Sequence, residues 1–276
     1  MSKLNFFLPI LIFIFFNCSN EDNPNNDGIF LGDIILRTQE DINDFGSYQY
    51  KKISGDLTII TDGVIDNIID LSPLNSISRV DNLLAIYNCS QLESIEFKMT
   101  EVGILTIINT KSKRINFPSL KEITSDFLII SDNSLLETIS FNQLTSTGSE
   151  LRIINNPKIE NLDGFQSLTH LGSNFGSGLQ IRDNPMLLNL SGLNNVNSEV
   201  VLLEIVNNYG LSSLNGINNI YFENIRILSN DNLTNFCAIK NTIEPEVNID
   251  GGQEYYVIDN KYNPTAEELI NGNCSQ

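Results

Sequence analysis

Apolar residues recur in a fixed pattern along most of this chain. The unit Leu-x-Ile-x-x-Asn/Asp, with variants, appears roughly every 21 to 28 residues. Its alternation predicts a short strand that turns its first and third side chains to one side. A repeat of this length predicts stacked units that share one continuous core. The first, third and sixth positions are Leu57, Ile59 and Asp62; Leu84, Ile86 and Cys89; Leu105, Ile107 and Thr110; Phe127, Ile129 and Asp132; Leu151, Ile153 and Asn156; Leu179, Ile181 and Asn184; Leu203, Ile205 and Asn208; and Ile225, Ile227 and Asn230.

The sixth position predicts a ladder of side chains where each strand bends into a turn. Asn and Asp side chains satisfy backbone groups at turns and tolerate unusual turn dihedrals. Cys89 occupies this position, and we interpret it as a buried ladder thiol. Three residues later another apolar residue follows in most units, whereas the third unit is irregular, with Ile115 two residues late. These following residues are Ile65, Leu92, Leu135, Ile159, Leu187, Leu211 and Leu233.

The complete unit resembles the leucine-rich repeat, in which the ladder position accepts Asn or Cys. Its loops resemble those of receptor L-domains, with Asn156-Pro157 and Asn184-Pro185 after strands and Gly164, Gly192 and Gly216 in return segments. Receptor L-domains are right-handed solenoids of short parallel strands, found in receptor ectodomains and in bacterial surface proteins. The resemblance implies a mainly β, right-handed β-solenoid over residues 53–236. Return segments such as 189–197 are too short and too rich in Asn and Gly for stable helices.

Both ends of a solenoid need a cap, because the core is otherwise open to water. Residues 29–52 are expected to form the first cap, with a short helix that begins at Thr38 and buries Ile42 and Phe45. Residues 237–276 are expected to form the second, with a last strand at 255–258 and a helix start near Thr265. A Cys237–Cys274 disulfide would staple this tail in an oxidising compartment; the alternative is two unpaired, partly buried thiols.

The N-terminus indicates export. Lys3 and the apolar run from Phe6 to Phe16 are typical of a signal peptide, because a membrane span needs about 20 apolar residues. Cys18 follows directly, and this arrangement resembles the lipobox of bacterial lipoproteins, with Phe15 and Asn17 in place of the usual residues. The resemblance implies a signal peptide over 1–17, a lipidated Cys18 and a polar tether over 18–28. The alternative is a plain secretion signal followed by an unmodified cysteine.

The predicted subcellular location is extracytoplasmic, with the lipid anchor in the outer membrane. Acidic residues just after Cys18 resemble the surface-export signal of some Gram-negative lipoproteins, and a solvated spacer explains them equally well. The formal net charge of −18 disfavours nucleic acid as a partner, since phosphate neutralisation drives that binding. The same charge disfavours direct attachment to anionic lipid. Membrane association is therefore expected only through the N-terminal anchor.

Catalytic and metal-binding signatures are missing from the sequence. His170 is the one histidine, and it lies in a glycine-rich insertion near Gly172. The oxygen-rich stretches 66–70 and 230–232 lack the spacing of a known calcium loop. We therefore predict no catalytic residue, no metal and no cofactor. A glycan hydrolase built on paired carboxylates remains as a remote alternative.

The outward positions of the strands suggest a binding face. If the first and third positions of each unit face the core, the fourth forms an almost unbroken apolar stripe with arginines nearby. Coverage of this stripe by another segment is the alternative. The predicted ligand-binding residues are Tyr87, Ile108, Ile130, Arg152, Ile154, Arg182, Val206 and Arg226. The leading hypothesis is a non-catalytic cell-surface binding module with a protein or glycan ligand. The second is a structural envelope lipoprotein without a soluble ligand.

Overall fold

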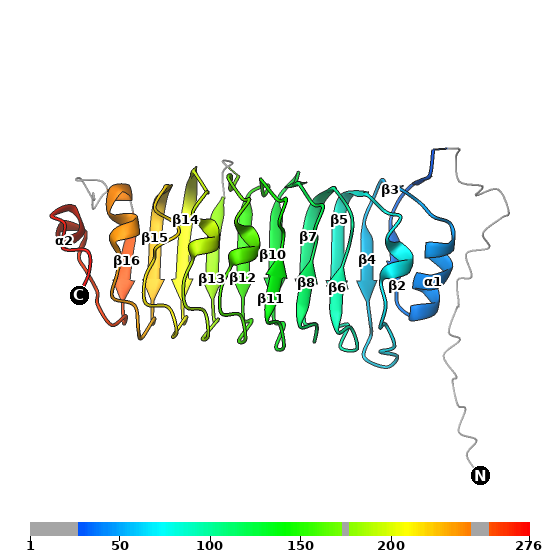
Figure 1. The fold of residues 1–276 in the computed structure, drawn as a ribbon, viewed down its shortest axis with the longest axis horizontal. Helices are drawn as coiled ribbons and strands as arrows, with labels where there is room; N and C mark the ends of the chain where they lie inside the picture. The colour runs from blue at the N-terminus through cyan, green and yellow to red at the C-terminus, as the bar shows by residue number, and fades with distance from the viewer. Residues whose placement is uncertain (1–26, 173–176, 244–253) are drawn as a thin grey trace, which may run out of the picture.

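The computed structural model describes residues 27–172, 177–243 and 254–276. It is a parallel β-solenoid of about nine turns (Figure 1). Its 13-stranded sheet contains β1 (Ile29–Phe30), β2 (Ile34–Leu36), β3 (Lys52–Ile53), β4 (Leu57–Ile60), β5 (Arg79–Tyr87), β7 (Glu101–Ile108), β9 (Glu122–Ile123), β10 (Phe127–Ser131), β12 (Glu150–Ile154), β13 (Gly178–Arg182), β14 (Ser198–Val206), β15 (Ile220–Leu228) and β16 (Tyr255–Ile258). The expected mainly β solenoid is confirmed.

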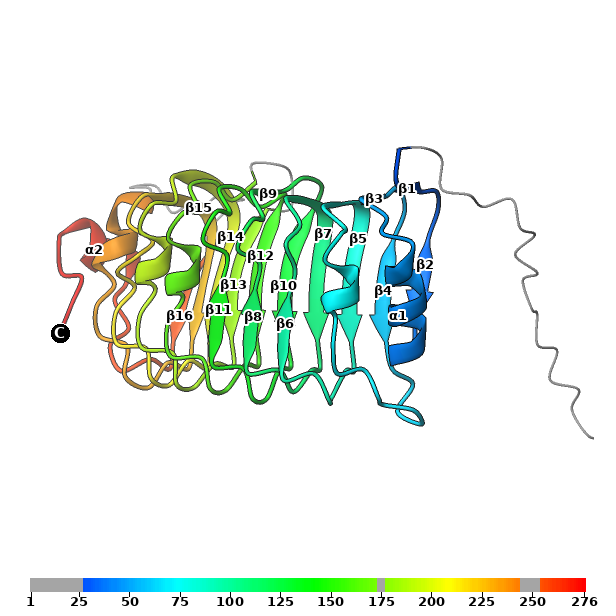
Figure 2. The same cartoon turned by 45° about the vertical axis from the view of Figure 1, so that its right-hand side comes forward.

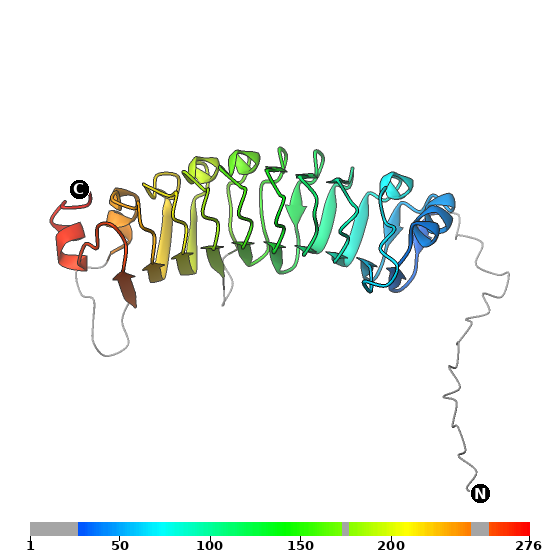
Figure 3. The ribbon, with the colours of Figure 1, turned by 90° about the horizontal axis from the view of Figure 1, so that it is seen from below.

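A second, smaller sheet is formed by return segments that follow three strands of the 13-stranded sheet, and the other regular elements are short helices. The three-stranded sheet contains β6 (Ser94–Glu96), β8 (Arg114–Asn116) and β11 (Thr138–Ser140). The α-helices are α1 (Gln39–Ser47) and α2 (Ala266–Ile270), and the 3-10 helices are η1 (Ser72–Leu74), η2 (Asp163–Phe165), η3 (Ser191–Leu193) and η4 (Cys237–Thr242). Figure 3 shows the rungs edge-on, with the large sheet on one side and the short helices on the other.

The repeated Leu and Ile positions stack in register and form the core. Leu57 pairs with Leu84, which pairs with Leu105, and the third positions follow the same order. These side chains are fully buried, as the alternation predicts. Because every rung contributes the same two inward residues, the core continues through the whole solenoid.

The unit that begins at Phe127 is shifted by one residue from the prediction. Leu128 and Ile130 pair with Leu105 and Ile107 and are fully buried, so the prediction that Ile130 lies on the outer face was wrong. Residues 127–130 are apolar at every position. The sequence of this strand therefore does not show which of its side chains face the core and which face outward. The ladder residue of this rung is Asn133 rather than Asp132, and Leu136 rather than Leu135 is the buried residue that follows.

The first and third units also depart from the predicted phase. Asp62 is exposed and outside the ladder, with its Oδ1 accepting the backbone N–H of Val64 at 2.9 Å, and Ile65 is 52% exposed. This bond from Val64, and a second from the backbone N–H of Ile65 at 3.2 Å, lower the pKa of the Asp62 carboxyl. Ile115 was predicted to be a late equivalent of Leu92, but it pairs with Ile95 in the small sheet and is therefore the equivalent of Ile95.

A buried asparagine ladder connects the later rungs. Its members are Asn133, Asn156, Asn184, Asn208, Asn230 and Asn260. The backbone N–H of Asn156 donates to Oδ1 of Asn184 at 3.0 Å, and its own Nδ2 donates to the carbonyls of Ile130 and Ile154 at 2.9 Å. Asn263 ends the series by accepting from Asn260 at 2.9 Å, in place of a further rung. From Asn156 to Asn260, each ladder side chain thus satisfies backbone groups of two rungs.

The residue before each ladder position, rather than the ladder residue itself, adopts the left-handed conformation. Asn and Asp occupy most of these sites, since they tolerate positive φ better than other non-glycine residues. Their side chains form a second row of bonds, such as Asn155 Nδ2 to Asp132 Oδ1 at 2.7 Å and Asn207 Nδ2 to Asp183 Oδ1 at 2.7 Å. The left-handed residues are Asn88, Asn109, Asp132, Asn155, Asp183, Asn207, Ser229 and Asp259.

The return segments pack closely at two of the predicted glycines. A Cβ on Gly164 would lie 2.0 Å from the carbonyl oxygen of Ile139, and one on Gly192 would lie 1.8 Å from that of Leu162. Neither distance is possible without moving the backbone. Glycine therefore allows adjacent rungs to stack at these points.

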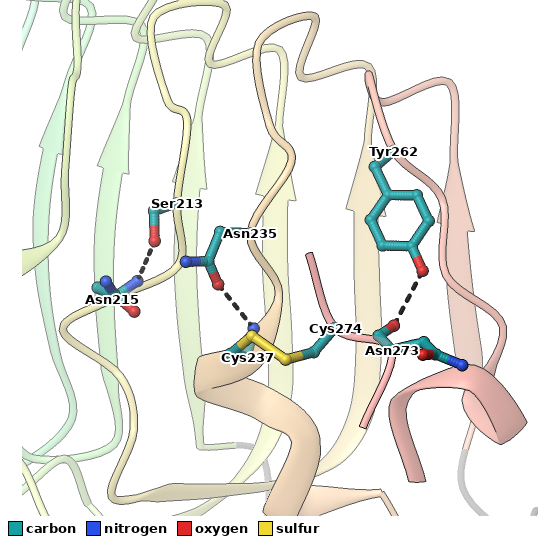
Figure 4. Close-up of a disulfide and its surroundings, with 7 residues drawn as sticks. All are labelled: Ser213, Asn215, Asn235, Cys237, Tyr262, Asn273 and Cys274. Atoms are coloured by element: carbon teal, nitrogen blue, oxygen red, sulfur yellow. Dashed lines mark hydrogen bonds between the residues drawn. A yellow bond between two sulfur atoms is a disulfide. The ribbon is translucent and has the colours of Figure 1, made fainter. Parts of the chain in front are cut away.

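Both ends of the core are covered as expected. Thr38 caps α1 with a reciprocal capping box to Asp41, and Ile42 is fully buried. Cys237 and Cys274 form the predicted disulfide, with 4.8 Å between their Cα atoms (Figure 4). The hydroxyl of Tyr262 donates to the carbonyl of Asn273 at 2.9 Å, which also fixes the tail.

Candidate binding face

The outer face of the large sheet carries most of the predicted site residues. Strand pairing aligns Tyr87, Ile108, Ile154, Arg182 and Val206 in one row. Ser131 replaces Ile130 at the fourth rung of this row, so the stripe is interrupted by a buried hydroxyl. The row continues beyond the predicted set through Leu228 to Ile258, which is 50% exposed.

Arg152 and Arg226 belong to a neighbouring row, two residues earlier on each strand. Pairing places Arg152 beside Ile129 and Gln180, and Arg226 beside Glu204 and Tyr256. The structure therefore brings the predicted residues onto one face, in two parallel rows, with Ile130 excluded. The face extends over the whole length of the repeat region (Figure 2).

In the first part of this face the residues next to the buried leucines are apolar, whereas the strand starts carry the paired charges of Arg79, Asp81 and Glu101. Leu83, Ile104 and Phe127 lie one residue before the first buried leucine of their rungs and are partly exposed, as is Ile129. Leu83 and Ile104 were not predicted because only outward positions after the leucine were considered, whereas Phe127 and Ile129 were wrongly predicted to face the core. The alternation itself contains the signal, since the residue before the leucine must face outward too.

The second part of the face is charged, and two of its carboxylates, those of Glu150 and Glu204, are paired with arginines. Glu150 contacts Arg152, whose guanidinium also lies 5.8 Å from the ring centroid of Phe127. Glu204 contacts both Arg182 at 3.3 Å and Arg226 at 3.5 Å. All three predicted arginines are thus held in place by neighbours, which limits the rotamer freedom that they would lose on binding a ligand.

Two shallow hollows adjoin the strands. One has a volume of about 370 Å³ and is lined by Arg226, Leu228, Glu254, Tyr256 and Ile258. The other, of about 550 Å³, lies near the strand starts and includes Glu122, Ser146, His170 and Glu199. Nδ1 of His170 lies 2.9 Å from Oγ1 of Thr169. The described residues contain no group of three or more His, Cys, Asp or Glu side chains that could hold a metal ion.

Cys18, the predicted signal peptide and most of the predicted tether lie outside the described residues. In the part of the chain that is described, no helix has the length and apolar character needed to cross a membrane. Comparisons with protein-family models, curated proteins and solved structures found no match.

Proposed function

We propose that this protein is a non-catalytic, lipid-anchored binding module that holds a partner protein along the outer face of its large sheet. The observation that carries this proposal is the long row of partly exposed apolar side chains, flanked by fixed arginines, on a sheet face that no described helix covers. Contiguous apolar surface with arginine nearby is typical of protein interfaces. A glycan is the less favoured ligand, since few aromatic rings are present on this face.

The resemblance to receptor L-domains supports the same function, because these solenoids recognise ligands in receptor ectodomains. The lipobox-like Cys18 supports an anchor in the outer membrane, with the binding face outside the cytoplasm. Solenoids suit this task because their stacked strands create an extended, rigid surface.

A structural role in the envelope is the second candidate, and one observation favours it. β16 is the last strand of the large sheet and pairs only with β15 among the described strands, so no described strand occupies its other edge. Tyr256 and Ile258 on this strand are each 50% exposed. A scaffold would associate through this edge in a concentration-dependent manner.

Site-specific photocrosslinking in intact cells tests the binding function. A benzophenone side chain would replace Tyr87, Ile154 or Val206 on the face, and Ser134 or Asn232 at the exposed turns as matched controls. We expect one discrete crosslinked partner from the face positions and none from the turns. Equal labelling at both sets would contradict the proposal, and crosslinks only to further copies of this chain would favour the scaffold.

Protease treatment of intact cells tests whether the protein is anchored at the outer surface of the cell. Wild type and Cys18→Ala would be compared, with a periplasmic protein as the control for membrane integrity. Surface anchoring predicts that wild type is cleaved and that the variant is lost from the membrane fraction. Protection of wild type would place the module on the periplasmic side.

A further inference from the structure

One cluster on the outer face has more positive than negative charge. Arg182 on β13 and Arg226 on β15 both contact Glu204, which lies on β14 between them, at 3.3 and 3.5 Å. The Glu204 side chain is 8% exposed, whereas those of Arg182 and Arg226 are 40% and 47% exposed. The single carboxylate therefore lies beneath two guanidinium groups, and these three side chains together carry one net positive charge, with the Glu254 carboxylate beside Arg226 in the neighbouring hollow.

The two guanidinium groups also keep free hydrogen-bond donors. A guanidinium carries five N–H groups, and each contact with Glu204 is made by one nitrogen. Nε of Arg182 is buried and has no acceptor among the described residues, so the donors that a ligand can reach lie on the exposed remainder of this side chain. Because Glu204 holds both side chains in position, they offer donors in a fixed arrangement, which suits a carboxylate.

An apolar strip adjoins this cluster. Strand pairing puts Arg182, Val206, Leu228 and Ile258 in one row across four neighbouring strands. The hollow of about 370 Å³ lies at the end of this row and brings Arg226 together with Leu228, Tyr256 and Ile258. Glu254 also lines the hollow. Its carboxylate would repel a second negative charge on the ligand, so the part of the ligand that enters the hollow should be uncharged.

The distribution of charge along the chain restricts the partner further. Residues 150–236 contain four basic residues, and three of them, Arg152, Arg182 and Arg226, lie on this face. The whole chain carries a formal charge of −18 and repels a strongly acidic molecule. Screening over about 8 Å at physiological salt still permits one carboxylate to reach the cluster.

We propose that the Arg182–Glu204–Arg226 cluster and the adjoining hollow bind a carboxylate that stands beside an aliphatic or aromatic side chain, on a partner protein that is neutral or basic overall. The arginines hold the carboxylate, and Leu228, Tyr256 and Ile258 contact the apolar group. This inference rests on the proposed binding function of the face and names the chemistry that one part of it recognises.

Small probes separate the two parts of this recognition. The purified protein would be titrated with N-acetyl-leucine, whose carboxylate is terminal, and with N-acetyl-glutamyl-leucinamide, whose carboxylate is on a side chain. The uncharged N-acetyl-leucinamide serves as the matched control. The readout is the NMR signal of each arginine Nε–Hε group, which reports contact at individual side chains.

We expect saturable shifts of Arg182 and Arg226 with at least one carboxylate probe and none with the amide. Arg182→Gln and Arg226→Gln should each weaken binding about tenfold, the equivalent of one charge-assisted contact. Arg79→Gln on β5, where the guanidinium contacts Asp81 and Glu101, is the matched control and should leave affinity unchanged. The probe that binds more tightly identifies a chain terminus or an acidic side chain as the source of the carboxylate.

Equal shifts with acid and amide, or no shift of either arginine, would overturn this inference. Circular dichroism of each variant ensures that a loss of binding is not a loss of fold. If the probes bind but photocrosslinking finds no partner, the site stands and the proposed function fails. If a partner crosslinks to the face while the probes leave the arginines unshifted, the function stands and this inference fails.

Discussion

The rungs before Asn133 and the rungs after it hold their stacks together by different means. From Asn133 onward each turn has a ladder asparagine that donates to and accepts from its neighbours. The preceding two rungs carry Cys89 and Thr110 at that position. Sγ of Cys89 faces the carbonyl of Tyr87 at 3.2 Å, the counterpart of one asparagine bond, but it offers the preceding rung no acceptor comparable to an amide oxygen.

The earlier rungs compensate with aromatic packing. Phe97, Phe117, Phe141 and Phe165 stack in consecutive rungs, with ring centroids 5.7, 5.2 and 5.3 Å apart. All four rings are fully buried. The stack begins in the rung that carries Cys89 and overlaps the start of the asparagine ladder. Neighbouring rungs can thus be kept in register by buried hydrogen bonds or by stacked rings.

Removal of a ladder amide should have the largest effect. Asn184→Ala leaves the backbone N–H of Asn156 and the carbonyl of Ile153 without this side-chain partner, while the carbonyl of Arg182 keeps its bond from the N–H of Asn155. We expect a loss of about 3 to 5 kcal/mol in the free energy of unfolding, since each buried unsatisfied group costs about 1 to 3 kcal/mol. Urea denaturation measures it. If Asn184→Ala lowers the free energy of unfolding by less than Thr110→Ala does, the asparagine ladder is not the main stabilising contact between the later rungs.

The thiol in the ladder should make stability depend on alkaline pH. Burial, and then the nearby Asp66, raise the pKa of Cys89 to about 12, whereas an unfolded cysteine has a pKa of about 8.5. Since the folded pKa is the higher one, the stabilisation is complete below about pH 8.5 and declines as pH rises toward 12. At pH 10 we expect about 2 kcal/mol less stability than at pH 7 from this group.

Cys89→Ala isolates this contribution, because it removes the thiol and leaves the tyrosines and lysines that also titrate at alkaline pH. The comparison is the difference between wild type and variant in urea midpoint at pH 7 and at pH 10. Identical pH slopes for the two proteins would show that the thiol titrates normally.

Disruption of the ring stack should have a smaller effect. Phe117→Leu keeps an apolar side chain but loses ring contacts with Phe97 and Phe141 on both sides. We expect a loss of about 1 to 2 kcal/mol, from two aromatic pairs partly offset by repacking. Hydrogen exchange should locate the added fluctuation in β6, β8 and β11. Phe236→Leu is the control, because that ring lies outside the stack.

Extension of the ladder should produce the smallest change and the opposite sign. Thr110 already donates to Oδ1 of Asn133 through its backbone N–H at 3.0 Å. Thr110→Asn would add an amide donor for strand carbonyls, so we expect a gain of about 1 kcal/mol. A thermal unfolding scan against wild type measures it. Destabilisation would show that the earlier rungs have no room for the amide.

Several features of the fold followed from local pattern. The alternation of Leu and Ile, the recurring asparagine and the capping residues predicted the strands, the buried ladder, the helix at Thr38 and the solenoid itself. The sequence favoured the pairing of Cys237, just after the last full rung, with Cys274 over two unpaired thiols, and this prediction is confirmed. These features depend on residues close in sequence or on repetition, and both can be read directly.

The phase of the rung at 127–131, the stacked rings and the charge cluster on the outer face were decided by the tertiary structure. An all-apolar strand fits the core in either register, and only the neighbours at Leu105 and Leu151 select the one that buries Ile130. The position of Glu204 beneath two arginines arises from contacts across three strands, and no single rung contains it. The sequence by itself therefore determined what each rung is made of, and the stacking of rungs determined which side chains meet.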